Sequence, residues 1–343
     1  MSRYIIRRVL LMIPILFGMS IIAFVVSRAI PVNPIEAAIG QQASDHPAIV
    51  AAYTKEWGLN KPLVVQYLTY MWNLLHGNLG ISIYTQRPVL TDLKTFMPAT
   101  IELATGAILI SLLVSVPLGV LAAMRRGGWI DRIVRLVTLI GVAMPLFWLA
   151  LLLITLFYVH WPIFPGPGRL GPTTIPPPRV TGLYTIDSIL SGQWGTLWDA
   201  LYHLALPCLC LSTWSMGLLT RITRAGMLSV LPQGYLQVAR SKGASERHVI
   251  WRHAWRNATI PVITVAGLAY GDLLTGAILI ETIFSWDGIG SYAYQSSINA
   301  DFPAIMGVAL LFGVIYLVVN LVVDILYAFV DPRVRSAMTV KQQ

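Results

Sequence analysis

The side chains that could do chemistry in this chain of 343 residues are few, and their spacing forms no catalytic set. His248 and His253 lie five residues apart, whereas a zinc-binding His-Glu-x-x-His helix needs a spacing of four. The sequence contains neither a Gly-x-Ser-x-Gly nucleophile elbow nor a Gly-x4-Gly-Lys-Ser/Thr phosphate loop. Cys208 and Cys210 stand in the apolar stretch "LPCLCLSTW", where packing inside a helix is the simpler interpretation than a metal site. The pattern predicts a protein that is not an enzyme and binds no metal and no nucleotide itself.

Composition places these residues in a membrane. The chain is 56% apolar and 11% charged, whereas a soluble domain is about a quarter charged. A helix needs about 20 mostly apolar residues to cross a bilayer. Six stretches are long and apolar enough, and they predict an all-α polytopic membrane protein with six transmembrane helices: Val9–Ser27, Ile101–Met124, Ile133–His160, Ala200–Thr220, Ile260–Phe284 and Ala304–Val330. We expect the first to be a retained anchor, because its apolar run is longer than a signal core.

The basic residues predict the orientation. Of the 24 Lys and Arg, 17 lie in the N-terminal tail, the link between the second and third spans, the segment 221–256 and the C-terminal tail. Basic residues favour the cytoplasmic side, so both termini and the 221–256 segment are expected in the cytoplasm. The net charge of +9 is thus sorted by loop, and nucleic acid is not a predicted partner.

The chain divides into two predicted regions. Residues 1–99 contain the first transmembrane helix and a long extracytoplasmic loop, in which Pro47 to Gly58 and Pro62 to Gly77 each predict an amphipathic helix. Residues 100–343 form a core of five transmembrane helices with a cytoplasmic loop at about 221–258. The second outer loop, residues 161–182, is rich in proline and predicts a stiff surface connector.

Four carboxylates lie within or at the ends of these spans: Glu102, Asp272, Glu281 and Asp324. A carboxylate in a membrane usually meets water or a partner. Glu102 and Glu281 fall near outer ends, where an interfacial position would suffice, and Glu281 is also a candidate translocation residue. Asp272 is about halfway through its span and is the best candidate to face a cavity. Asp324 could instead pair with an arginine on the cytoplasmic side.

Small residues recur at a spacing of four in two spans. Gly267 and Gly271 do so in the fifth, and the second has the series Ala107, Ser111, Ser115 and Gly119. This spacing favours close helix packing, and a sliding interface along a pore is the sharper alternative. Gly267 and Gly271 therefore join Asp272 and Glu281 as candidate pore residues.

The segment "LPQGYLQVARSKGASERHVIWRHAWRNATIP" is basic and amphipathic. Pro232 favours a helix start, and Tyr235, Val238 and Ala239 form an apolar stripe beside Arg240 and Lys242. Gly243 interrupts this helix. Ser245 predicts the N-cap of a second helix with Glu246 in its first turn, and on one face of it lie Trp251, Ala254, Trp255 and Ala258. The pattern suits either a surface lying on anionic lipid or a docking element for a partner.

Together with this segment, "MSRYIIRRVLLMIPILFGMSIIAF", "QYLTYMWNLLHGNLGIS", "ETIFSWDGIG" and "NLVVDILYAFVDPRVR" resemble the permeases of binding-protein-dependent ABC importers of the dipeptide, oligopeptide and nickel family. The resemblance covers nearly the whole chain. The family loop motif begins Glu-Ala-Ala where this chain has Gln237, Val238 and Ala239. Asn78 and Asp287 stand where the family often has Asp and Pro.

The resemblance implies a type I ABC importer permease fold in a bacterial inner membrane. Expected partners are a second homologous permease subunit, two cytoplasmic ABC ATPase subunits, an extracytoplasmic solute-binding protein and membrane lipid. ATP and Mg²⁺ would be used by the ATPase subunits, and no cofactor is expected on this chain. The implied ATPase-coupling loop contains Tyr235, Ala239, Arg240, Lys242, Gly243, Ser245, Glu246, His253 and Arg256.

The expected solute is a dipeptide or short oligopeptide. Nickel or its chelates, glutathione, opine-like or sugar conjugates and cell-wall peptides stay open, because the binding protein of such importers largely sets specificity. An intramembrane enzyme and a structural membrane subunit are the alternatives of a different class.

Overall fold

The computed structural model describes residues 2–29, 54 and 60–330. Within these ranges the chain forms helices joined by turns and loops, with an isolated bridge between Ile81 and Pro88 in place of a sheet. The helices are α1 Ser2–Ala29, α5 Leu63–Leu75, α6 Val89–Met124, α7 Trp129–Ala143, α8 Leu146–Ile154, the π-helix η1 Thr155–His160, α9 Tyr184–Leu190, α10 Trp194–Val230, α11 Gly234–Ser241, α12 Glu246–His248, the π-helix η2 Val249–Ala254, α13 Trp255–Gly276, α14 Ile278–Ile283, α15 Ile289–Ile298 and α16 Phe302–Val330.

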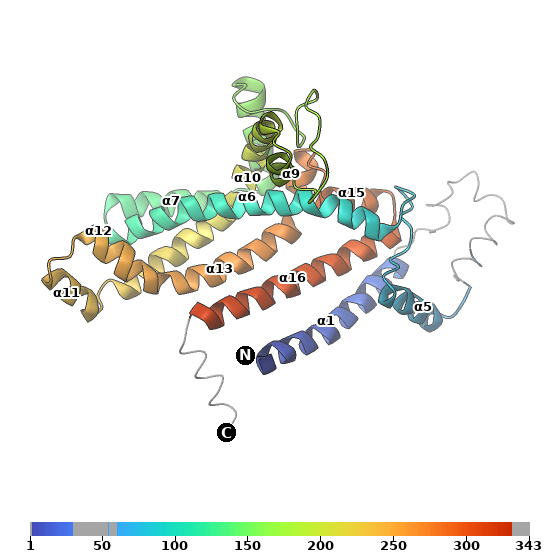
Figure 1. Ribbon diagram of the computed structural model, residues 1–343, viewed down its shortest axis with the longest axis horizontal. Helices are drawn as coiled ribbons and strands as arrows, with labels where there is room; N and C mark the ends of the chain where they lie inside the picture. Colours follow the sequence, from blue (N-terminus) through green and yellow to red (C-terminus); the bar gives the residue numbers. More distant parts are fainter. Residues whose placement is uncertain (1, 30–53, 55–59, 331–343) are drawn as a thin grey trace.

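The molecule is an elongated bundle in which α1, α6, α10, α13 and α16 follow the long axis (Figure 1). Helices α11 and α12 lie at one end, and α5 and α15 lie at the other. Five described helices are long and apolar enough to cross a membrane, and a bent pair makes a sixth if it counts as one span. Helix α10 has 37 residues and is therefore about 55 Å long, well beyond the ~30 Å of a bilayer core. The bundle must extend out of the membrane at one end or both.

The third predicted span is not a single helix. Helices α7 and α8 meet at Met144 and Pro145 with a bend of 99°. Met144 has an extended backbone, φ −72° and ψ 129°, which is the conformation that a following proline favours. Pro145 then occupies the N-cap of α8. The proline thus breaks the span outright, where the sequence predicts a continuous helix from Ile133 to His160.

The fifth predicted span is also shifted. A continuous helical segment runs from Glu246 to Gly276, so the second helix of the basic segment and the fifth span are one rod. It ends before the predicted Phe284, because the helix breaks at Ala277 and α14 begins at Ile278.

Helices α6 and α10 form the most extensive helix pair of the bundle. The small residues of α6 face this contact, as the sequence predicts: Ala107, Ser111, Ser115 and Gly119 are all buried. Ser111 Oγ lies 2.6 Å from Ser215 Oγ of α10. Cys208 and Cys210 are free and buried in the same core, which confirms their packing role.

The ends of the bundle confirm two further predictions. Helix α5 begins after Pro62 and ends before Gly77, which has a φ of +75°, while the helix predicted over 47–58 lies outside the described residues. Arg8 on α1 pairs with Asp324 on α16, with Nη2 2.9 Å from Oδ2.

Helix α6 runs without a break through the predicted boundary at residues 99 and 100.

Candidate functional site

One end of the molecule is an elbow, which we define as residues 234–258 (Figure 1). It consists of α11, a turn at Gly243, α12, η2 and the first turn of α13. Every residue that the resemblance assigns to the coupling loop lies in it, from Tyr235 to Arg256. The elbow is therefore the candidate site, and the turn at Gly243 joins its two arms.

The turn is a Schellman motif. Gly243 has a φ of +81°, in the left-handed region that glycine adopts at little cost. Its N–H donates to the carbonyl of Arg240 at 2.9 Å, and the N–H of Ala244 donates to the carbonyl of Ala239 at 3.2 Å. These two hydrogen bonds close the end of α11. Gly243 thus sets the direction in which the chain leaves α11.

An ion pair joins the two arms of the elbow across the turn. Arg240 Nε lies 2.7 Å from Glu246 Oε1, and both side chains are exposed. Water screens an exposed ion pair, which therefore contributes little to stability, so this pair orients the arms more than it stabilises them. Ser245 occupies the N-cap position as predicted, although its hydroxyl makes no cap hydrogen bond.

The inner side of the elbow is an apolar cluster. Leu236 is fully buried against Val249, Ile250 and Ala254. This cluster continues into Met227 and Val230 of α10 and into Val120 and Ala123 of α6. The elbow is therefore packed against the ends of two long helices and is not a free loop.

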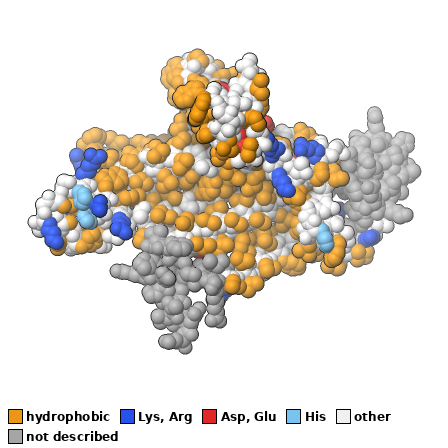
Figure 2. Space-filling view, viewed as in Figure 1, with side chains coloured by type: hydrophobic (Ala, Val, Ile, Leu, Met, Phe, Trp, Pro, Cys, Tyr) orange, Lys and Arg blue, Asp and Glu red, His pale blue; other side chains and the backbone are white. Residues whose placement is uncertain are grey.

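The outer side carries the remaining apolar and basic groups. The predicted stripe is divided between the two sides, because Tyr235 and Val238 are 39% and 55% exposed while Ala239 packs against the buried cluster. Trp251 is 43% exposed, and Lys and Arg side chains surround this end of the molecule in Figure 2. A small apolar patch with basic neighbours on a rigid helix pair suits insertion into a groove on another protein.

The two elbow histidines lie next to each other. The rings of His248 and His253 are 5.3 Å apart between centroids, because the wider π-helical turn of η2 brings residues five apart onto one side. Among the described residues no group of three His, Cys, Asp or Glu side chains could hold a metal ion.

A buried ion pair near the elbow was missed by the sequence analysis. Arg224 of α10 donates from Nε and Nη2 to the two carboxylate oxygens of Asp131 on α7, at 2.7 and 2.9 Å. The N–H of Gly127 donates to the same carboxylate at 3.0 Å. Asp131 is fully buried, so this pair fixes the α6–α7 turn to α10. The available signal was a single acid among the basic residues of that link.

Two of the candidate pore residues are packing residues in this chain. A Cβ added at Gly267 would collide with Val323 of α16, and one added at Gly271 would come within 3.3 Å of Val319. The glycines thus allow α13 and α16 to approach closely. Asp272 lies on α13 beside them, and its side chain is exposed. Asp272 alone of the four candidate pore residues is exposed, but it lies four residues before the end of α13 at Gly276 and not halfway along a span, where the sequence predicts it.

Glu281 has a structural role. It is fully buried, accepts a hydrogen bond from Thr100 Oγ1 at 2.6 Å and accepts another from the N–H of Ser291 at 3.0 Å. A Cβ on Gly288 would overlap its carboxylate. The carboxylate therefore organises the turn after α14, and the translocation role of Glu281 stays a prediction.

Glu102 likewise has its partners inside the subunit. Its side chain is buried, and Oε2 lies 2.7 Å from Nη2 of Arg169 in the proline-rich loop. Thr185 donates to Oε1 through both its N–H and its hydroxyl at 2.7 Å. The guanidinium of Arg169 also lies over the Tyr184 ring, 3.6 Å from its centroid. The loop is thus held to α6 through Glu102, whose partners Arg169 and Thr185 the sequence does not reveal.

Comparison with known proteins gives consistent matches along the chain. Residues 115–336 match the family model "Binding-protein-dependent transport system inner membrane component", and residues 1–104 match the corresponding N-terminal model. The chain is 45% identical over 317 residues to the "Probable D,D-dipeptide transport system permease protein DdpB" of Escherichia coli, covering 92% of this chain and 93% of that one. It is 41% identical to the "Dipeptide transport system permease protein DppB" of Alkalihalophilus pseudofirmus, covering 98% and 100%.

A third relative is the "Di/tripeptide transport system permease protein DppB" of Pseudomonas aeruginosa, with 42% identity over 98% of this chain and 99% of that one. Among solved structures, an inward-facing form of the MetNI methionine ABC transporter is 15% identical, with a TM-score of 0.47 over 68% of this chain and 93% of that one. The protein is a multi-pass inner-membrane subunit of a transport system and not an enzyme. By its family models and its relatives, the chain belongs to the binding-protein-dependent transport system inner membrane components.

Proposed function

We propose that this chain is one permease subunit of an ATP-driven importer of dipeptides or short oligopeptides. The observation that carries the proposal is the near-complete coverage of relatives named for dipeptide, di/tripeptide and oligopeptide transport. A second permease subunit would complete the pore, and an extracytoplasmic binding protein would deliver the solute. ATP and Mg²⁺ would be bound by two separate ATPase subunits.

The elbow is the proposed ATPase-docking element. Its buried side joins α6 and α10, and its second arm continues into α13 without a break. A partner that moves the elbow would therefore move three long helices together. Tyr235, Val238 and Trp251 would enter the partner's groove, with Lys242 and Arg256 at its rim.

Asp272 is the residue we propose for the translocation path. It is exposed in the last part of α13, four residues before the helix ends at Gly276, where a second permease subunit would enclose it. A peptide carries a charged amino terminus, and a carboxylate is a suitable partner for that group. The remaining selectivity would come from the binding protein.

Solute uptake tests the proposal. Cells lacking the chain should fail to accumulate labelled dialanine, and the wild-type chain should restore uptake. Unlabelled tripeptide and D-Ala-D-Ala as competitors would define the peptide class, and unlabelled nickel should not compete. Restored nickel uptake without peptide uptake would refute the peptide assignment.

A docking variant tests the elbow within the same assay. Val238→Asp places a charge in the proposed contact and should abolish both uptake and co-purification of the ATPase subunits. Val180→Asp is the control, because Val180 is 71% exposed in the outer loop, far from the elbow. ATPase subunits that co-purify normally with Val238→Asp would place the docking surface elsewhere.

A further inference from the structure

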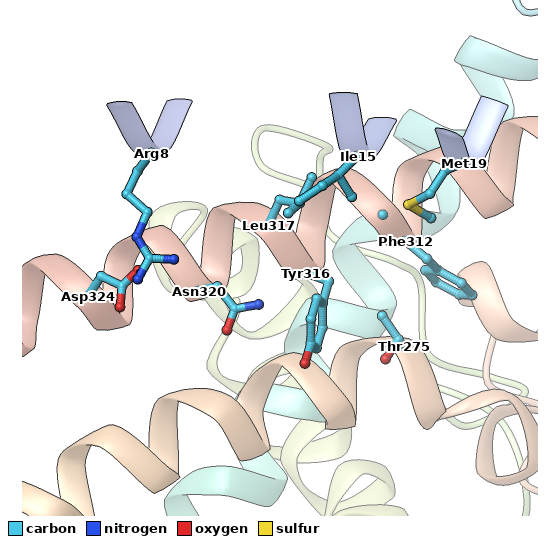
Figure 3. Close-up of a pocket in the computed structure, with 10 residues that line it drawn as sticks. Arg8, Ile15, Met19, Thr275, Phe312, Tyr316, Leu317, Asn320 and Asp324 are labelled. Carbon is cyan, nitrogen blue, oxygen red and sulfur yellow. The ribbon is translucent and has the colours of Figure 1, made fainter. Parts of the chain in front are cut away.

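A crevice of about 690 Å³ opens between α1, α13 and α16, away from the elbow (Figure 3). Helix α1 packs chiefly on α16, and the crevice lies where the two helices and α13 leave space. Its lining changes character along its length. One end has Arg8, Asn320 and Asp324 and the other has Met19 and Phe312, while Leu317 and Tyr316 lie between them.

The polar end is charged and accessible. The Arg8 and Asp324 side chains form their ion pair while 47% and 26% exposed, and Asn320 lies beside them in Figure 3. Arg7 precedes Arg8 and is exposed as well. Within the lining the charges of Arg8 and Asp324 balance, and Arg7 adds a positive charge next to this end.

The crevice has the length of one membrane leaflet. Phe312 and Asp324 are twelve residues apart on α16, which corresponds to about 18 Å at the helical rise. Arg8 and Met19 are eleven residues apart on α1, or about 17 Å. Half of a bilayer core is about 15 Å. The polar end coincides with the ends of the two apolar spans, Ile6–Arg28 and Phe302–Leu326, and the apolar end with their middles.

We propose that this crevice is a binding site for a phospholipid, with preference for an anionic headgroup. The guanidinium of Arg8 binds the lipid phosphate, because arginine has five donors and can hold a phosphate and Asp324 together. One acyl chain lies along Ile15, Met19, Leu317 and Phe312. The lipid fills the space between α1 and the bundle, so it acts as part of the packing of α1.

Lipid retention by the assembled transporter tests the apolar half of the site. Native mass spectrometry after purification in mild detergent should detect phosphatidylglycerol bound to the wild-type complex. Leu317→Trp fills the crevice and should reduce retention about tenfold or more. Val318→Trp is the matched control, because Val318 is the next residue on α16, is 45% exposed and does not line the crevice. Equal retention by both variants would overturn the proposal.

Two charge variants test the polar half. Arg8→Gln should weaken retention of phosphatidylglycerol about tenfold, whereas Asp324→Asn should preserve or strengthen it, because the arginine remains. Equal loss of lipid by the two variants would mean that Arg8 only neutralises Asp324. That result would refute the role of Arg8 in binding the lipid phosphate. A photoreactive acyl chain should label α1 and α16 peptides. A Met19→Cys cross-link to the second permease subunit would show protein in the crevice and would also overturn the proposal.

Discussion

Gly243 is the residue on which the direction of the elbow depends, and the reason is conformational rather than steric. Its φ of +81° lies in the left-handed region, yet a Cβ at this position would meet nothing within 4 Å. A side chain there fits in space and still costs about 1–2 kcal/mol of backbone strain. The strain can be relieved only by changing the angle between α11 and α12.

We therefore predict that Gly243→Val uncouples transport without preventing membrane insertion. The changed angle would misplace Tyr235 and Val238, so dipeptide uptake and transport-coupled ATPase activity should fall severalfold at unchanged abundance. Uptake per subunit, measured with an immunoblot of the membrane fraction, checks this.

Two variants serve as controls for that prediction. Gly234→Val adds the same side chain to the same helix at a position that also has open space but lacks a positive φ, and it should transport normally. Gly243→Asn should retain partial activity, because asparagine tolerates the left-handed conformation better than valine. Full uptake by Gly243→Val would remove the turn from the coupling mechanism.

Two positions on α13, Asp272 and Gly267, should respond differently to substitution, because one side chain is exposed and the other position is tightly packed. Asp272→Asn should lower uptake while abundance stays near the wild-type level, because the side chain is exposed. Gly267→Val should instead lower abundance, because its side chain would collide with Val323 and overpacking costs about 1–3 kcal/mol. Quantified abundance and initial uptake rates distinguish the two. If Asp272→Asn disappears from the membrane, the residue has a structural role.

At the scale of elements, composition predicts where helices lie better than how they connect. The apolar stretches locate the five described helices that are long enough to span and the bent α7–α8 pair, because bilayer crossing requires length and hydropathy that few other segments have. Pro145 marks an interruption, but the 99° bend between α7 and α8 also depends on what they pack against. The continuity from Glu246 to Gly276 is equally hidden, because Pro261 could mark a new helix start in the sequence but lies inside α13 in the structure.

The candidate site shows the same division between local and distant information. Gly243 and Ser245 are recognisable from sequence because turns and caps depend on neighbouring residues. Partners far along the chain are not recognisable: Asp131 and Arg224 are 93 residues apart, and Glu281 meets Thr100 across 181. Leu236 was overlooked because a short helix with apolar residues on two sides does not reveal which side α10 covers.

The Asp131–Arg224 pair should therefore stabilise the connection between elements more than the elbow pair does. Arg224→Met leaves the buried Asp131 carboxylate with Arg135 at 3.5 Å as its remaining cation. We expect a loss of up to about 3 kcal/mol, because breaking a buried pair exposes a charge to uncompensated desolvation. Thermal unfolding of the detergent-solubilised complex, followed by size-exclusion chromatography, measures the loss.

The elbow pair supplies the matched control for this comparison. Arg240→Met breaks an exposed ion pair between the same types of group and should change stability much less than Arg224→Met does. The double variant Arg224→Met with Asp131→Asn should recover part of the lost stability, because the unpaired charge is gone. Equal shifts in melting temperature for Arg224→Met and Arg240→Met would show that burial of the Asp131–Arg224 pair adds nothing to stability.

At the scale of the whole molecule, the elbow and the α5–α15 end must lie on opposite sides of the membrane. The long helices connect these two ends directly (Figure 1), and α10 is longer than a bilayer core is thick. The distribution of Lys and Arg predicts that the elbow is cytoplasmic. This orientation determines whether an ATPase can reach Tyr235 and Val238 at all.

Single cysteines test the orientation cleanly because the native thiols are hidden: Cys208 and Cys210 are 1% and 0% exposed and should give little background. Gln237→Cys in the elbow and Gln295→Cys in α15 both replace exposed residues. A membrane-impermeant maleimide should label Gln295→Cys in intact spheroplasts and Gln237→Cys only in inverted vesicles. ATPase subunits added to the inverted vesicles should shield Gln237→Cys from the reagent and leave Gln295→Cys unaffected. The reverse labelling pattern would place the elbow outside the cell, where no cytoplasmic ATPase could reach it.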